Sequence, residues 1–132
     1  MRSLEAILED LLRQVDGATV VGVGGMDGLV VEQRPESRGA SADVLEGDGV
    51  PDLAVCVAEL TTILAGARRA VADALGGGPI EALQVRSEAR LVFVRHVTPQ
   101  HYLLLVAPPA TDEGRVAGAL AEAAAQVQEL AA

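Results

Sequence analysis

The chain has 132 residues, enough for one domain around one hydrophobic core. Its net charge of −9 argues against nucleic-acid partners, because phosphate binding requires a clustered excess of basic side chains. No apolar run reaches the length of a membrane span, and the acidic start MRSLEAILEDLL does not resemble a signal peptide. We therefore expect a cytoplasmic protein without membrane insertion.

The first part of the chain predicts a short helix followed by a β-hairpin. Ser3 is a good N-cap, and apolar residues then repeat at helical spacing until Gly17 provides a stop. Residues 18–24 are apolar on both faces, which is typical of a central strand. A tight turn at 26–28 leads into a returning strand at 29–33.

Residues 34–50 predict a surface loop with the composition of a mobile segment, because proline, glycine, serine and acids outnumber apolar residues there. The loop is long for a compact domain. Asp43, Glu46 and Asp48 do not follow the order of a calcium-binding EF-hand loop, and solvation of the segment is the simpler interpretation.

Residues 51–75 form the longest helix pattern in the chain, and this pattern has two different faces. One face carries the apolar stripe of a core-facing helix: Leu53, Cys56, Val57, Leu60, Ile63, Leu64, Ala67, Val71 and Leu75. The opposite face carries mostly small residues: Val55, Ala58, Thr62, Ala65, Gly66, Arg69 and Asp73. Because small side chains let two helices approach closely, we predict that this face packs against a second copy of the chain. An ordinary surface helix in an alanine-rich chain is the alternative.

The last part of the chain predicts three strands and a helix. Glycines at 76–78 and Pro79 end the long helix pattern. Three strands follow with short connections that make neighbours antiparallel: residues 80–86, 90–97 and 102–107. Thr111 or Asp112 caps a final helix. Its predicted buried stripe is Val116, Ala119, Leu120, Ala123, Val127 and Leu130.

The predicted element order is αββαβββα, and the fold class is α+β. A five-stranded antiparallel sheet with the long helix on one face and the two terminal helices on the other satisfies every apolar stripe. No internal repeat or domain boundary interrupts residues 1–132, so we expect a single domain.

Motifs for cofactors and metals are weak. The glycines at 22–25 suggest a dinucleotide loop, but Asp27 occupies the place of the third glycine and the segment leads into a hairpin, so glycines of a turn are the better interpretation. Cys56, His96 and His101 would need a further ligand to hold a metal, and a small buried hydrophobe and strand-end histidines are the simpler interpretation. We predict no cofactor, no metal and no catalytic residue.

The strand after the long helix is predicted to lie at a sheet edge. An unpaired edge is normally protected, either by pairing with another strand or by charged side chains. If two copies pair this strand across a two-fold axis, the same operation brings the small-residue helix faces together. The alternative is a monomer whose edge is guarded by Arg86 and Glu81.

The combined pattern resembles Roadblock/LC7 domains, a profilin-like fold. The resemblance rests on the element order and on three segments, DGLVV at 27–31, LAVCVAEL at 53–60 and VRHVTPQHYLLLV at 94–106. It covers nearly the whole chain, and its specificity lies in the joint order of soft signals. It implies a homodimer with a continuous ten-stranded sheet and no enzymatic activity. Bacterial members of the MglB type often regulate a small Ras-like GTPase that docks on the paired central helices.

Carried over to this chain, the resemblance implies a dimer interface at Val55, Ala58, Thr62, Ala65, Arg69, Leu83, Gln84, Val85 and Arg86. It leaves Glu59, Gly66 and Asp73 available to a partner. The 34–50 insertion is a departure from the MglB-type pattern. The alternative function is a passive scaffold subunit, as in dynein light chains and lysosomal adaptors, and an enzyme is the third hypothesis.

Overall fold

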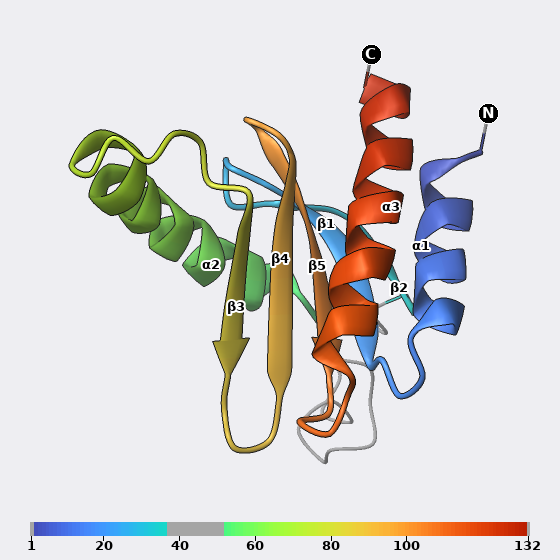
Figure 1. Cartoon of the computed structure of the whole chain (residues 1–132). Coiled ribbons are helices and arrows are strands. Elements are labelled where there is room, and N and C mark those ends of the chain that lie inside the picture. Colours follow the sequence, from blue (N-terminus) through green and yellow to red (C-terminus); the bar gives the residue numbers. More distant parts are fainter. Residues whose placement is uncertain (1, 37–51, 132) are drawn as a thin grey trace.

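The computed structural model describes residues 2–36 and 52–131, and the predicted order αββαβββα is confirmed (Figure 1). Its elements are α1 (Leu4–Gln14), β1 (Val20–Gly25), β2 (Val30–Arg34), α2 (Ala54–Ala67), the π-helical segment η2 (Arg68–Asp73), β3 (Ala82–Arg86), β4 (Leu91–Thr98), β5 (His101–Ala107) and α3 (Glu113–Ala131). Most of the predicted 34–50 loop, including Asp43, Glu46 and Asp48, lies outside the described residues.

The strands form one five-stranded sheet in the order β2-β1-β5-β4-β3, and every neighbouring pair is antiparallel. β1 pairs on both sides and all six of its residues are buried, so the prediction of a central strand is confirmed. β2 and β3 are the two edges. α1 and α3 lie together on one face of the sheet and α2 lies on the other (Figure 1), which confirms the predicted fold class.

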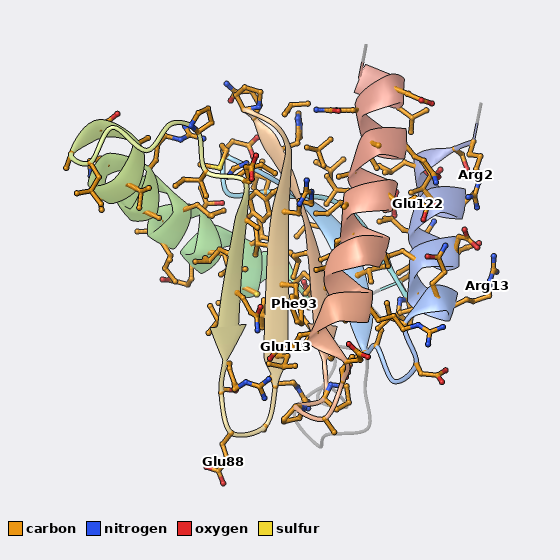
Figure 2. The ribbon with its side chains drawn as sticks, viewed as in Figure 1. Arg2, Arg13, Glu88, Phe93, Glu113 and Glu122 are labelled. Atoms are coloured by element: carbon orange, nitrogen blue, oxygen red, sulfur yellow. The ribbon has the colours of Figure 1, made fainter. Side chains whose placement is uncertain are left out.

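The face covered by α1 and α3 is closed by an apolar core. Ser3 caps α1 by accepting a hydrogen bond from the Ala6 amide at 3.1 Å, and Asp112 caps α3 by accepting one from the Arg115 amide at 3.2 Å. Phe93 points from β4 into this layer (Figure 2). It packs with side chains of both helices and of β5, among them Leu8, Leu11, Leu103, Leu105, Val116 and Leu120.

On the other face, Tyr102 of β5 fixes α2 to the sheet. Its buried hydroxyl donates to the Val57 carbonyl at 3.1 Å and lies 3.0 Å from the Thr61 hydroxyl. Leu53, Val57, Leu60 and Leu64 form the buried stripe of the helix. Glycine is required at position 24, because a Cβ there would lie 2.8 Å from the Tyr102 ring.

The buried stripe of the central helix is narrower than predicted. The prediction was wrong for Ile63, Val71 and Leu75, whose side chains are 50%, 38% and 78% exposed. From Arg68 the helix continues as a π-helix, which turns the chain less per residue and rotates Val71 away from the sheet. The end of the helix and the loop after it also stand out beyond β3 (Figure 1).

Candidate interaction surface on α2, η2 and β3

Exposed apolar side chains are concentrated between the start of α2 and the end of β3. Among the described residues, seven large apolar side chains are exposed, and five of them lie on this stretch: Val55, Ile63, Val71, Leu75 and Val85. The other two, Leu29 and Val31, belong to the β1–β2 hairpin. We call the first group, with the exposed small residues between its members, the α2–β3 surface. A gathering of this kind marks an interaction site more often than scattered single residues do.

The composition of α2 explains why this surface exists. Glu59 is the only charged residue among the 14 of the helix. A helix that is apolar on all sides is normally buried on all sides. Within residues 2–36 and 52–131, the sheet covers only one side of α2, and the opposite side of the helix remains open.

The residues of the predicted small face lie on α2 and η2, mostly on the sides of these helices that the buried stripe does not use. Their role as a dimer interface stays a prediction. Ala65 and Gly66 are half-buried, and the others are exposed: Val55, Ala58, Thr62, Arg69 and Asp73. Glu59 is exposed beside them. A Cβ added at Gly66 would meet only the Arg69 guanidinium, at 3.8 Å, so there is open space above this glycine. The helix face is therefore accessible to a flat, closely approaching surface.

The β3 edge continues this surface. Among the described strands, β3 pairs only with β4, as the predicted edge position requires. Leu83 and Val85 lie opposite Val94 and Val92 on the α2 side of the sheet. Arg86 forms an ion pair with Glu113 and donates to the Pro109 carbonyl at 3.2 Å. Its guanidinium is thus held at the start of α3, on the opposite face of the sheet from the exposed Val85 side chain.

Cys56, His96 and His101, the other candidates from the sequence, lie at separate places in the fold. Cys56 is half-buried at the edge of the α2-side core, where burial raises the pKa of its thiol. His96 lies beside Tyr102 with ring centroids 6.0 Å apart, whereas the exposed His101 contacts the Thr98 hydroxyl at 3.3 Å. Within residues 2–36 and 52–131, no three His, Cys, Asp or Glu side chains come together as a metal site would require.

The glycines at 22–25 lie in strand β1 and lead into a hairpin, so the interpretation as turn glycines was wrong for most of them. Their role is close packing. A Cβ at Gly22 would lie 2.7 Å from Leu53, just as one at Gly24 would strike Tyr102. The turn itself uses Asp27, whose carboxylate accepts from the Leu29 amide at 3.1 Å, and Gly28 at φ +86°.

A scan against models of protein families and a search of curated proteins each find no match. Among solved structures, the fold is similar to a Roadblock/LC7 domain from Streptomyces avermitilis, with a TM-score of 0.77 at 19% identity over 98% of both chains. It is also similar to the gliding protein MglB from Thermus thermophilus, with a TM-score of 0.77 at 21% identity over 96% of this chain and 86% of that one. A third similar structure, MglC from Myxococcus xanthus, has a TM-score of 0.60 at 27% identity over 97% of this chain and 98% of that one.

The chain therefore has the Roadblock/LC7 fold, and the predicted resemblance is confirmed at the level of the fold. Among the described residues, no helix is both long enough and apolar enough to cross a membrane.

Proposed function

We propose that this chain is a non-enzymatic homodimer that binds a small Ras-like GTPase on its paired α2 helices, and regulates it or serves as its adaptor. The observation that carries the proposal is the α2–β3 surface, which combines an almost uncharged helix with a free strand edge. The similarity in fold to MglB and MglC supports the same function.

A two-fold axis beside β3 would cover both parts of this surface at once. Antiparallel pairing of two β3 edges would give a ten-stranded sheet and satisfy the free backbone groups. The same rotation would bring the open sides of two α2 helices together, since a two-fold interface uses the same patch on both copies. Ala58 and Thr62 are small enough to allow close contact between those helices.

The dimer is tested by introducing a charge at each of two similarly exposed apolar positions. Val55 and Leu29 are 75% and 66% exposed, but only Val55 lies on the α2–β3 surface. Light scattering at micromolar concentration should give twice the chain mass for the natural sequence and for Leu29→Glu, and one chain mass for Val55→Glu. Gly66→Arg should act like Val55→Glu, because it fills the open space above that glycine. A monomeric natural sequence would overturn the dimer.

GTPase binding is tested on the exposed acids beside the predicted interface. Charge reversal of Glu59 and Asp73 to arginine should weaken capture of a small Ras-like GTPase that the natural chain binds, and leave the dimer mass unchanged. Glu88 is the matched control, because it projects from the tip of the β3–β4 turn, away from α2 (Figure 2). Equal binding by all three variants would remove these acids from the partner site.

Turnover separates a regulator from a passive scaffold. GTP hydrolysis and nucleotide exchange by the same GTPase are measured with and without the dimer. A changed rate of either reaction supports a regulator, whereas binding with both rates unchanged supports a scaffold subunit. Absence of binding in both the GDP and the GTP-analogue states would overturn the proposal. Arg69 is exposed on η2, but its position alone does not make it a catalytic arginine supplied to the GTPase.

A further inference from the structure

A cavity of about 540 Å³ lies where η2 leaves the sheet. Its wall comes from three segments that are distant in sequence: η2, the loop before β3, and the end of β4 with its turn. The lining is mostly apolar and includes Ala72, Pro79, Ile80, Val97 and Pro99. The volume falls within the range of small-molecule pockets, and π-helical segments are frequent at functional sites. The Roadblock-type dimer proposed above does not require this cavity.

Two side chains of the cavity wall, His96 and Arg68, carry nitrogen atoms that are suited to hydrogen bonding with a ligand. Nδ1 of His96 is buried and, among the described residues, has no hydrogen-bond partner. An unsatisfied buried polar atom costs free energy, so a ligand that the His96 ring turns to meet gains affinity by bonding to it. The Arg68 guanidinium also lines the cavity and lies close enough for its charge to act on His96. It donates to the Pro99 carbonyl at 3.4 Å, which is a long bond that a better acceptor can replace.

We propose that this cavity binds a small monocarboxylate with an apolar body, its carboxylate accepting hydrogen bonds from Arg68 and His96. A carboxylate has two acceptor oxygens and therefore serves both side chains, one of them through a charge-assisted bond. The apolar body of the ligand covers Ile80 and the prolines of the wall.

The charges on the wall also set which carboxylates fit. Asp73 lines the cavity at the other end of η2 and forms no ion pair in the described part of the chain. Its negative charge disfavours a second anionic group, so a monocarboxylate binds more tightly than a dicarboxylate of the same length. The Thr98 hydroxyl is occupied, because it accepts from the amides of Gln100 and His101 at 3.1 Å. It therefore contributes little to recognition.

The two histidines of the chain make a direct test possible. Decanoate is titrated into the full chain while the ring signals of His96 and His101 are followed by NMR. We expect saturable shifts at His96 and little change at His101, which is exposed and does not line this cavity. Decanol, with the same body and no charge, should bind more weakly. No change at His96, equal shifts at both rings, or equal binding of decanol would overturn the proposal.

Three substitutions sharpen the test. Arg68→Gln should weaken decanoate binding roughly ten- to a hundred-fold, as expected for loss of a hydrogen bond to a charged group. Asp73→Asn should strengthen it roughly two- to five-fold by removing repulsion. Arg90→Gln is the control, since Arg90 lies in the β3–β4 turn away from the cavity. Because Asp73 also belongs to the proposed GTPase contact, ligand binding is measured without the GTPase, and failure of either proposal leaves the other intact.

Discussion

The α1/α3 side and the α2 side of the sheet differ in how completely one chain covers them. The α1/α3 side encloses a cluster of 18 buried residues, whereas the α2 side encloses nine. All the exposed large apolar residues among those described lie outside α1 and α3, and five of seven lie between α2 and β3. The two sides use similar residue types, so the difference lies in the number of covering helices.

This difference shows that an apolar residue in the sequence is not always buried within a single chain. Two helices cover the closed side, and their outward faces carry charged residues that are exposed to solvent. A single helix covers the open side, and Glu59 is the only charged residue that α2 offers there. The closed side is therefore complete within one chain. The open side has the composition of a core that a second surface completes.

The largest expected effect is on the closed side. Leu105→Ala removes a fully buried side chain between the sheet and its two helices. The lost transfer free energy and the remaining cavity should reduce the free energy of unfolding by about 2–5 kcal/mol, measured by urea denaturation. A cost below about 1 kcal/mol would mean that this core collapses around the gap, and the contrast between the two sides would lose its basis.

A smaller effect is expected where α2 is attached to the sheet. Tyr102→Phe removes a buried hydroxyl that bonds the Val57 carbonyl and contacts Thr61. We expect a cost of about 1–2 kcal/mol in the free energy of unfolding. Thr61→Val in the same background should then cost less than it does alone, because the two hydroxyls interact. Strictly additive costs would show that the hydroxyls act independently and that packing alone holds α2.

Regular patterns made most of the fold predictable from the sequence. Capping by Ser3, the apolar strand at 18–24 and the glycines after the long helix each act locally, so a single sequence displays them. The bend of the helix into a π-helical segment at Arg68 has no comparable local signal, and it caused the wrong placement of Val71.

The candidate surface was predictable in part. The small residues on the outward side of α2 were identified from spacing alone. The exposure of Ile63 and Leu75 was missed, because every apolar residue at helical spacing was assigned to the core. The near absence of charge in residues 54–67 was the available signal, since a helix with one charged residue requires cover on more than one side. The cavity beneath η2 depends on three distant segments, which no single stretch of sequence displays together.

The open side should also respond to pH through His96. Burial, followed by the charge of Arg68, lowers the pKa of this ring below its usual 6.5, although backbone hydrogen bonds partly oppose the shift. The folded chain therefore favours the neutral ring. This contribution to stability is fully present above about pH 6.5 and is lost as the pH falls through the lower folded pKa. Urea denaturation between about pH 7.5 and 5.5 should show a loss that His96→Gln reduces and His101→Gln retains.

The smallest expected effect is at Leu75, and it bears most directly on the contrast between the two sides. Leu75 is 78% exposed, so Leu75→Ala should change the free energy of unfolding by less than about 0.5 kcal/mol when the protein is dilute enough to be monomeric. At concentrations where a second copy covers the α2–β3 surface, the same substitution should cost more, because the side chain then leaves water. A cost that does not change with concentration would show that no second copy covers Leu75, and a cost above about 2 kcal/mol at high dilution would show that the isolated chain already buries it.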